Sequence, residues 1–523
     1  MKSRFLFVAA ENDAIPRCKA GGMGDVVRDV PRQIAARGDE AIVITPSYSR
    51  IHLQDSQRIS EIKFTFRGVP HTGELYEVQG KKEIEGIRHF VIHHHDIKAG
   101  DIAHIYFNDA DQPFFTDANI FSLFCSAVAA TIKAGIFGEI NVVHLHDWHT
   151  SMLLFLREFD PEYELLKSIH FVYSIHNLAI QGIRPFSNNY SSVDAFFPNV
   201  PYDYEVLQDR RYPDCINLMA VGIRLADAVH TVSPSYMEDI QKPSDPPHFI
   251  GGEGLEEDLR NANKENRLFG ILNGANYTDI NSVEKGILFR QCIRRLFRWL
   301  QEENKDYKSH YLAHTGEKLT RWQQKQPDFI CCSVARLTEQ KFFFFRENPD
   351  LLPALMKKLE EVNGIYLLLG TGAPEYETIF REASYKYKNL IFINAQSESV
   401  IDMLYQESDL YLMPSQFEPC GISQMLAMRN GQPCLVHNTG GLKDTVVHGK
   451  TGFSFDGNTT EEKTADFLKQ FSNAVDLFFQ NKKEWKKIRE NAKKQRFTWN
   501  KSVDAYYELL YRYDKDQVSN LQS

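Results

Sequence analysis

The chain has 523 residues, of which 43% are hydrophobic and 25% charged, and its net charge is −9. This length is too great for one hydrophobic core, so two large domains are expected. The composition is ordinary for a globular protein. The acidic balance excludes a protein that binds nucleic acid through most of its surface.

Neither the cysteines nor the apolar runs point to secretion or to a membrane. None of the eight cysteines forms a Cys-x-x-Cys pair, which favours a reducing cytoplasm. The apolar run within Met1–Ala10 is shorter than the core of a signal peptide, and a first β-strand explains it better. No apolar run approaches the roughly 20 residues that span a bilayer. We therefore expect a cytoplasmic protein without membrane association.

The N-terminal region alternates buried strands with helices. Phe5–Ala9 is predicted as a strand, Ala20–Asp25 as a glycine-rich turn, Val26–Ala36 as a helix and Ala41–Ile44 as a second strand. This alternation is typical of a parallel sheet covered by helices on both faces. Residues 61–107 instead alternate apolar and polar side chains, which predicts antiparallel hairpins at the edge of the sheet.

Polar side chains then follow three further predicted strands. Val142–Leu145 leads into His146 and Asp147, Phe171–Ile175 leads into His176, and Ala228–Val232 leads into a Ser-Pro pair. Open α/β sheets bind ligands just beyond the carboxyl ends of their strands. These positions are therefore candidates for ligand contacts.

The first domain is predicted to cover residues 1–265 and to end in an irregular, acidic stretch, Pro243–Glu265. Gly270–Gly274 is read as the opening of a second domain, residues 266–498. Ile287–Leu300 has the pattern of a basic amphipathic helix; packing on the protein surface is favoured there over binding to an anionic membrane. Glu302–Gln326 is read as a polar, lysine-rich linker.

The second domain repeats the α/β pattern, so the fold class is α/β with two Rossmann-like domains. The strands and helices predicted in it are, in chain order, Phe329–Val334, Pro353–Val362, Ile365–Leu369, Leu390–Ile393, Ser399–Gln406, Leu410–Met413, Gly421–Arg429, Cys434–Val436 and Lys482–Lys494. A final helix, Lys501–Tyr511, is predicted after this domain.

Glu418 follows one of these strands and precedes the predicted helix Gly421–Arg429. Pro419 would occupy the first turn, where proline is favoured, and the amides of Cys420 and Gly421 would face an anion. Glu418 could then accept hydrogen bonds from sugar hydroxyls. An ordinary helix cap explains the same residues equally well.

Two further groups carry charge suited to phosphate. Arg336 and Lys341 follow the strand Phe329–Val334 and could neutralise a diphosphate, although solvated surface cations are the usual alternative. Lys19 lies beside Gly21, Gly22 and Gly24, and glycine allows backbone amides to approach an anion. A glycine run alone is more often only a turn.

Metal binding and nucleophilic catalysis are less favoured. His144, His146, Asp147, His149 and His176 could suggest a metal, as could His93-His94-His95, but no carboxylate pair has the spacing of a two-metal site. Cys420 could act as a nucleophile, yet the sequence identifies no histidine or asparagine partner for it. A small residue in a pocket wall is the preferred interpretation of Cys420.

Taken together, these stretches resemble the bacterial glycogen synthases and plant starch synthases, which are retaining glucosyltransferases of the GT-B fold. The resemblance extends over nearly the whole chain, and its motifs occur in the order of the family. They are Lys19–Asp25, His146–Thr150, Ile175–Gly182, Thr231–Pro234, Gly270–Gly274, Arg336–Lys341, Phe417–Gly421, Thr439–Leu442 and Phe497–Trp499.

The resemblance implies transfer of glucose, with retention, from ADP-glucose or UDP-glucose to the 4-hydroxyl at the non-reducing end of an α-1,4-glucan. It also implies two Rossmann-like domains that face each other across a cleft, with the C-terminal segment 499–523 returning to the first. The first domain would lie on the acceptor side and the second on the donor side.

The resemblance further assigns roles to individual residues. Arg336 and Lys341 would hold the diphosphate, Glu418 and His176 would contact the donor sugar, and Asp147 would lie nearby. No metal or other cofactor is expected, because side chains and helix termini carry the phosphate charge, and the leaving phosphate would assist a front-face attack. The further donor-binding residues are Lys19, Gly21, Gly22, Gly370, Cys420, Gly421, Thr439, Gly440 and Gly441.

Three positions depart from the family pattern. Phe342 begins a run of four phenylalanines where the family has glycine, which predicts a restricted approach of this loop to phosphate. Ala220 replaces a lysine, and Asn276 replaces a common aspartate. These departures keep two alternatives open: a GT-B enzyme with another donor or acceptor, and a weakened, glucan-binding relative. Phosphorylase chemistry is less favoured, because a lysine motif for pyridoxal phosphate is not apparent.

Overall fold

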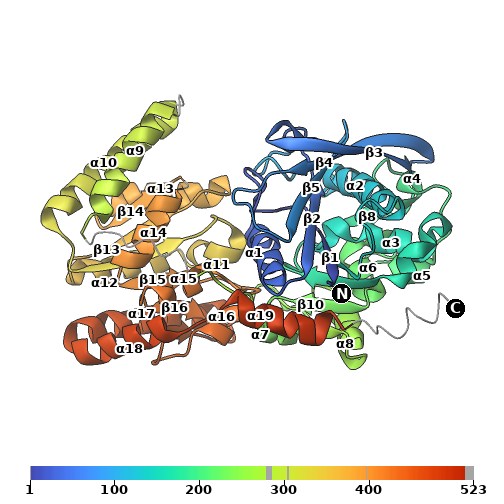
Figure 1. The fold of residues 1–523 in the computed structure, drawn as a ribbon. Coiled ribbons are helices and arrows are strands. Elements are labelled where there is room, and N and C mark those ends of the chain that lie inside the picture. The colour runs from blue at the N-terminus through green and yellow to red at the C-terminus, as the bar shows by residue number, and fades with distance from the viewer. Residues whose placement is uncertain (1, 278–285, 303–305, 396, 513–523) are drawn as a thin grey trace. The chain divides into compact units, whose positions relative to one another are not determined.

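The computed structural model describes residues 2–277, 286–302, 306–395 and 397–512. The chain forms two compact units (Figure 1). Among the described residues, the first unit comprises 2–244, 251–273 and 499–512, and the second comprises 245–250, 274–277 and the described part of 286–498.

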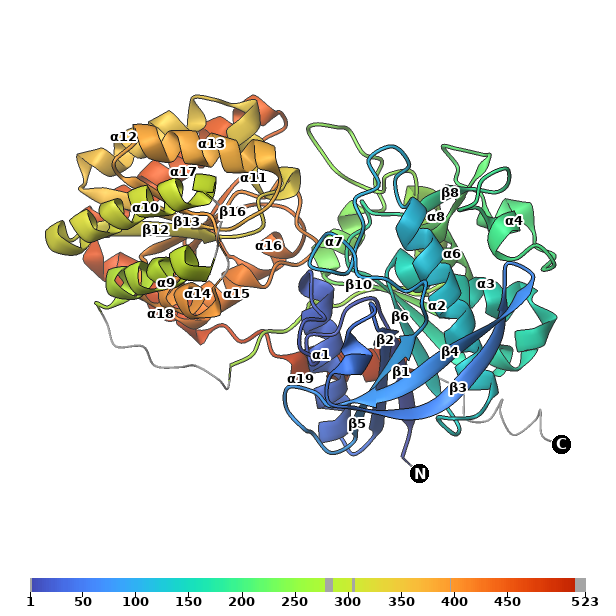
Figure 2. The same ribbon diagram turned by 90° about the horizontal axis from the view of Figure 1, so that it is seen from above.

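The first unit is built on a nine-stranded sheet of described residues, in the order β11-β10-β7-β6-β1-β2-β5-β4-β3. The strands from β11 to β5 are parallel, and β4 and β3 are antiparallel at one edge, as predicted (Figure 2). The strands are β1 Arg4–Val8, β2 Glu40–Pro46, β3 Ser56–Phe66, β4 Val69–Val78, β5 Ile87–His93, β6 Val142–His146, β7 His170–Ile175, β10 Ala228–Thr231 and β11 Leu268–Gly270.

A small hairpin and a set of helices complete this unit. The hairpin pairs β8 Ile183–Pro185 with β9 Cys215–Asn217. The helices are α1 Gly22–Ala36, α2 Phe115–Lys133, α3 Met152–Phe159, α4 Val193–Phe196, α5 Tyr204–Leu207, α6 Leu218–Leu225, α7 Pro234–Asp239, α8 Glu256–Lys264 and α19 Trp499–Ala505.

The structure changes the interpretation of the end of the first domain. Pro243–Glu265, predicted as irregular, contains the nine-residue helix α8. This helix is strongly polar, so its periodicity was concealed, yet it buries Leu259 and Ala262. Strand β11 pairs with β10 in the first sheet, and the first unit extends to residue 273. The predicted boundary after residue 265 therefore lies before the last strand of the first sheet.

The second unit contains a six-stranded sheet of described residues, all parallel, in the order β14-β13-β12-β15-β16-β17. Its strands are β12 Phe329–Val334, β13 Gly364–Leu369, β14 Leu390–Ile393, β15 Leu410–Met413, β16 Cys434–His437 and β17 Phe453–Phe455. Its helices are α9 Leu288–Glu302, α10 Asp306–Lys325, α11 Glu339–Glu347, α12 Leu351–Glu361, α13 Pro374–Lys386, α14 Glu398–Glu407, α15 Ser423–Arg429, α16 Gly440–Thr445, α17 Thr460–Gln480 and α18 Lys482–Lys494.

The predicted linker Glu302–Gln326 is wrong, because helix α10 occupies most of it. Buried residues on one face of α10, Leu319 and Trp322 among them, pack with buried residues of α9 in one hydrophobic cluster. Figure 1 shows the two helices lying together and extending away from the sheet of the second unit. The high content of lysine and glutamine hid this apolar face in the sequence.

The four phenylalanines Phe342–Phe345 lie in helix α11, and all four side chains are buried in the core of the second unit. Phe342 is 1% exposed, and its ring lies 5.0 Å from that of Phe380. The backbone at Phe342 has φ −128°, which does not require glycine. The phenylalanine side chain thus fills the core, and the structure gives no reason for it to obstruct the loop before it.

Helix α2 is long and apolar enough to cross a membrane by length and composition, which the sequence reading overlooked. However, 83% of its apolar window is buried inside the protein. It packs against α3 and β3 in the first unit. These features are those of a core helix. Among the described residues, α2 is the one helix with a length and composition that could span a membrane.

The C-terminal helix α19 packs on the first unit, as the resemblance implied. Arg37, at the end of α1, donates hydrogen bonds to Asn500 and pairs with Asp504. Farther along, the ring of Tyr511 lies 4.8 Å from that of Phe5 in β1. In Figure 1 the red C-terminal helix accordingly lies beside α1.

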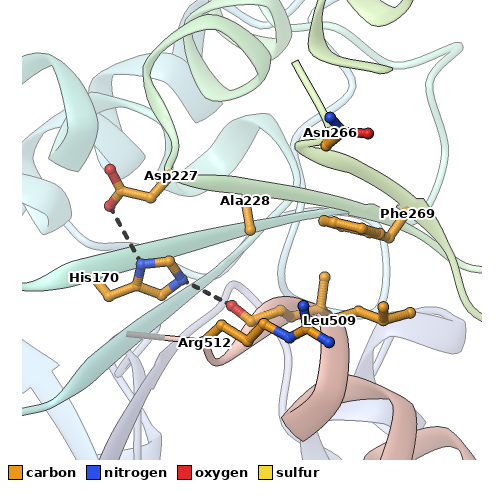
Figure 3. A pocket seen from close by; sticks show the side chains of 8 residues that line it. His170, Asp227, Ala228, Asn266, Phe269, Leu509 and Arg512 are labelled. Carbon is orange, nitrogen blue, oxygen red and sulfur yellow. Dashed lines mark hydrogen bonds and ion pairs between the residues drawn. The ribbon is translucent and has the colours of Figure 1, made fainter. Parts of the chain in front are cut away.

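A hollow of about 430 Å³ lies beside this docked segment (Figure 3). His170, at the start of β7, has Nε2 2.8 Å from the carbonyl oxygen of Leu510 and Nδ1 4.0 Å from a carboxylate oxygen of Asp227. Arg512 also lines it. Because the hollow lies where β7 and β10 begin, it is at the opposite end of these strands from the predicted site residues, none of which lines it.

A chain of hydrogen bonds crosses the first unit. The Tyr511 hydroxyl lies 2.9 Å from His144 Nδ1, and His144 Nε2 lies 2.6 Å from Ser174 Oγ. Ser174 Oγ is also 2.7 Å from His230 Nδ1, and His230 Nε2 is 3.3 Å from the carbonyl oxygen of Ile271. When His230 Nε2 donates to Ile271, Ser174 can donate to His230 Nδ1, His144 Nε2 to Ser174, and the Tyr511 hydroxyl to His144 Nδ1. Each ring then carries one proton, so His144 and His230 are both neutral.

We predict that replacing Phe342 by alanine lowers the free energy of unfolding by about 3–5 kcal/mol, because a buried aromatic ring is lost from the core. Urea denaturation followed by circular dichroism measures this change. Phe297→Ala is the control: Phe297 is 62% exposed, and exposed substitutions change stability by about 0.5 kcal/mol or less. Equal effects of the two substitutions would contradict the burial described above.

We predict that the protein loses stability as the pH falls from about 6.5 to about 4. Burial lowers the pKa of His230 to about 4 and that of His176 to about 3. Below about pH 6.5 these histidines therefore bind protons in the unfolded chain but not in the folded chain. This difference favours unfolding as the pH falls. Thermal unfolding measured across this range checks the prediction. His230→Gln should reduce the pH dependence, and an unchanged pH dependence in that variant would contradict it.

Candidate active site

Among the parallel strands of each sheet the strand order reverses once, and the predicted site residues follow the strands at or next to these two places. In the first unit β1 lies between β2 and β6, and in the second unit β12 lies between β13 and β15. At such a reversal, the loops after two neighbouring parallel strands run in opposite directions. A crevice lies between these loops at the carboxyl ends of the strands, and ligands bind there. The topology therefore gives each unit one candidate site.

In the second unit, the first turn of helix α11, which follows β12, forms an ion pair with the loop after β15. The ammonium of Lys341 forms an ion pair with the carboxylate of Glu418, and Ser415 Oγ donates to the same carboxylate over 3.0 Å. Glu418 is buried, with 5% exposure. The backbone N–H of Gln416 also donates to the carbonyl oxygen of Gln340 over 2.8 Å. These contacts hold the start of α11 against the loop after β15.

The predicted helix start at Pro419 is wrong. Helix α15 begins at Ser423, and Glu418–Gly421 forms an irregular turn in which Gly421 has φ +74°. A second glycine is needed beside it: a Cβ on Gly441 would lie 2.4 Å from the Cα of Cys420. The N–H of Gly441 donates to the carbonyl oxygen of Glu418 over 3.0 Å. Close packing of these two loops, and not a helix terminus, therefore positions Glu418.

Other predicted donor-binding residues surround this turn. Arg336 is exposed and forms no ion pair with a described residue. Gly370, at the end of β13, is packed so tightly that a Cβ would lie 2.0 Å from the carbonyl oxygen of Ala335. Thr439 precedes α16, whose first residue, Gly440, has φ +43°. The glycines thus allow the loop after β13 to approach the segment that carries Arg336, and the start of α16 to approach the segment that carries Glu418.

In the first unit, the glycine loop is held by a carboxylate. The N–H groups of Ala20 and Gly21 donate to Glu11 Oε2 over 2.8 and 2.6 Å, and Glu11 is buried. Lys19 pairs with Asp25 at 2.7 Å and with Asp13 at 3.3 Å. The loop therefore binds an anionic group through its amides, as the sequence suggested, but in this structure the group is a side chain of the protein.

Gly22 is the first residue of α1 and has open space where a Cβ would stand. Gly24 does not: a Cβ there would lie 3.2 Å from both Glu11 Oε2 and Lys19 Cγ. Position 24 therefore requires a small residue, because a side chain there would crowd the Glu11 carboxylate that accepts from the amides of Ala20 and Gly21. Gly22 stays a predicted donor contact without such a steric requirement.

Asp147 and His176 lie together at the ends of β6 and β7. The N–H of His176 donates to Asp147 Oδ1 over 2.7 Å, and His176 Nε2 lies 2.9 Å from His146 Nδ1. Burial raises the pKa of Asp147 to about 7, and its backbone is left-handed, with φ +55°. A buried carboxyl group held in strained backbone is a frequent property of functional sites.

Two residues of this region, Glu11 and Tyr106, were not predicted as site residues. Glu11 and Tyr106 are one pair: the Tyr106 hydroxyl donates to Glu11 Oε1 over 2.7 Å. The Tyr106 ring lies 5.1 Å from that of His149, which directly follows Trp148. Glu11 could have been found as the first charged residue after β1, whereas Tyr106 comes from a long loop without a recognisable pattern.

Three ring nitrogens near the end of β6 are buried without a hydrogen-bond partner among the described residues: His146 Nε2, Trp148 Nε1 and His149 Nδ1. Each unpaired buried polar atom costs about 1–3 kcal/mol. Because these nitrogens are buried, only a partner inside the protein, such as an enclosed water molecule, could supply the missing hydrogen bonds.

The two remaining departures occupy structural positions. Ala220 lies in α6 and is fully buried, and Gly222 two residues later packs so closely that a Cβ would lie 2.1 Å from the Tyr173 ring. A lysine in place of Ala220 would bury a charge. The carbonyl oxygen of Asn276 accepts a hydrogen bond from Arg429 over 2.6 Å, a contact that does not depend on its side chain.

The comparisons with known proteins agree with this arrangement. Residues 4–261 match the family described as starch synthase catalytic domain, and residues 317–495 match glycosyl transferases group 1. The chain is 31% identical over 514 residues to a glycogen synthase of Streptococcus sanguinis, covering 97% of this chain and 99% of that protein. It is 32% identical over 531 residues to one of Clostridioides difficile, covering 97% and 98%.

Solved structures show the same fold. The catalytic domain of starch synthase IV from Arabidopsis thaliana, bound to ADP and acarbose, superposes with a TM-score of 0.74 at 21% identity, over 98% of this chain and 99% of that one. A sucrose-phosphate synthase from Thermosynechococcus elongatus gives a TM-score of 0.54 at 15% identity, over 97% and 98%. Because the chain is 31% and 32% identical to these glycogen synthases over nearly its full length, it belongs to the glycogen and starch synthase family. The members of this family are hexosyltransferases of the GT-B fold.

Proposed function

We propose that this enzyme transfers glucose from ADP-glucose to the 4-hydroxyl at the non-reducing end of an α-1,4-glucan, with retention of configuration. The names of its relatives and the ADP and acarbose bound to the Arabidopsis starch synthase support this choice of donor and acceptor. UDP-glucose is the alternative donor.

One observation carries the proposal: the buried ion pair between Lys341 and Glu418, at the reversal point of the second sheet. A buried carboxylate requires a partner, and here the partner is a cation that a diphosphate would also attract. When the diphosphate of the donor binds Lys341, the Glu418 carboxylate becomes available to the hydroxyls of the glucose. Arg336 lies five residues earlier with an exposed guanidinium that can bind phosphate oxygens in a bidentate manner.

The chemical step requires charge to move onto the leaving diphosphate. Lys341 and Arg336 would stabilise that charge, and fixed charges of this kind lower the barrier because they need no rearrangement during the reaction. We propose that the acceptor hydroxyl attacks from the side of the leaving group and gives its proton to a phosphate oxygen. Glu418 would orient the glucose and not form a covalent intermediate.

The first unit would contribute to binding of the sugar. His176 is neutral, since burial lowers its pKa to about 3, so it can exchange hydrogen bonds with hydroxyls without adding charge. Asp147 holds the loop that carries His176. Lys19 would exchange one of its two aspartate partners for the ligand. These roles are proposals that follow from the chemistry of each side chain.

The proposed reaction needs no metal, because cationic side chains carry the phosphate charge. We also propose a cytoplasmic location, which the eight free cysteines support. A chelator should leave the transfer rate unchanged if the first of these statements is correct.

The central test is an assay of purified protein with glycogen and either ADP-glucose or UDP-glucose, in which released nucleoside diphosphate and chain length are both followed. Chain extension by α-linkages is the expected result, faster with ADP-glucose. A β-linkage would contradict retention. Donor hydrolysis without extension would indicate another acceptor, and glucan binding without turnover would indicate a weakened relative.

We predict that Lys341→Ala and Glu418→Ala each lower kcat at least about 100-fold, the usual loss when a charge-stabilising contact is removed. The double variant should lose much less than the sum of the two free-energy effects, because the residues form one pair. Steady-state kinetics with ADP-glucose measures both.

Lys357→Ala is the control for charge removal, because Lys357 is an exposed residue of α12. It should keep kcat near that of the unchanged protein. Near-normal turnover in both the Lys341 and the Glu418 variants would remove this pair from the active site.

A further inference from the structure

Two histidines face each other at the antiparallel edge of the first sheet. His71 lies in β4, and His94 directly follows β5. The two strands pair with Glu74 opposite His93, so their register places Gly73 opposite His94. His71 and Gly73 share a face of β4, so His71 and His94 are diagonal neighbours on one face. The strand pairing, and not a flexible loop, thus sets their separation.

The separation suits a shared metal ion. His71 Nδ1 lies 3.3 Å from His94 Nε2. Two nitrogens that bind one tetrahedral Zn²⁺ at about 2.0–2.1 Å stand about 3.3–3.4 Å apart. Asp96 adds a carboxylate, and one potential ligand atom from each of these residues lies within 4.8 Å of the other two. This is the one described group of histidine, cysteine and acidic residues that meets this criterion.

A simple hydrogen bond between the rings accounts for the geometry less well. A distance of 3.3 Å is longer than the usual 2.7–3.2 Å range for hydrogen bonds donated by N–H groups. In that arrangement His94 would donate to His71 Nδ1, so His71 Nε2 would carry the proton. That nitrogen is buried and has no hydrogen-bond partner among the described residues. This N–H group has the same surroundings whether the two rings share a hydrogen bond or a metal ion, so the separation of the two nitrogens is what favours the ion.

We propose that His71 Nδ1, His94 Nε2 and the Asp96 carboxylate bind a divalent ion of the zinc, copper or nickel type, with water completing the coordination. Two imidazoles and one carboxylate favour these ions over Mg²⁺ and Ca²⁺, which prefer oxygen ligands alone. No net proton is released: the proton on His94 Nε2 moves to Nδ1, and the 3.2 Å contact between Nδ1 and the Asp96 N–H lengthens. The ion would join β4 to the segment after β5.

Isothermal titration calorimetry with Zn²⁺ tests this, using the full chain without a histidine tag, after removal of bound metal by a chelator. We expect one ion per chain and a metal-dependent rise in Tm, because a ligand that binds the folded state stabilises it. Co²⁺ in place of Zn²⁺ should give the visible absorption of a tetrahedral site. His71→Ala and His94→Ala should each weaken binding by at least about tenfold and abolish the rise in Tm.

The control is His310→Ala, since His310 is an exposed histidine of α10; its Zn²⁺ affinity should equal that of the unchanged protein. His71→Gln and His94→Gln, checked by circular dichroism, guard against loss of affinity through unfolding. An unchanged affinity in folded variants at both positions, or no binding with Zn²⁺ in excess, would overturn the proposal. The transfer assay is independent of this outcome, because no residue of the hairpin belongs to the proposed active site.

Discussion

The arrangement of both candidate sites depends on one topological constraint, the reversal of strand order at β1/β6 and at β12/β15. The loops that follow the parallel strands on either side of such a point run in opposite directions. Residues at the carboxyl ends of these strands, between the two loops, therefore remain accessible. Glu11 and Asp147 follow the two strands in the first unit, and Lys341 and Glu418 follow the two in the second. Tight glycine packing then brings the loops close enough for side chains to interact.

In each candidate site, a lysine is paired with carboxylates of the protein. Lys341 is paired with Glu418, and Lys19 with Asp13 and Asp25, while Glu11 accepts the amides of the glycine loop. Burying an unpaired charge is costly, so cations and carboxylates that are wholly or partly buried in these loops require such partners. A donor that bound to these lysines, as proposed, would replace existing ionic contacts. Its affinity would then depend on the difference in free energy between the contacts that it forms and those that it breaks.

Much of the fold could be predicted because its strands are short, continuous apolar runs, such as Leu410–Met413. Helix α10 was missed because its buried residues are few among lysines and glutamines. The turn at Gly421 could not be predicted, since it depends on the backbone of Gly441, distant in sequence. The same applies to His71 and His94, which only the β4–β5 register brings together. Long-range contacts of this kind leave no local pattern.

The first unit is discontinuous along the chain, with the second unit inserted between residue 273 and residue 499 except for the excursion 245–250. During synthesis, the nine-stranded sheet is complete more than two hundred residues before the segment that covers it has been made. Until then Phe5, His144 and His170 lack the contacts that Tyr511 and Leu510 provide. The nascent first unit therefore exposes apolar and polar surface for the time needed to translate the whole second unit, a period in which chaperone binding would be advantageous.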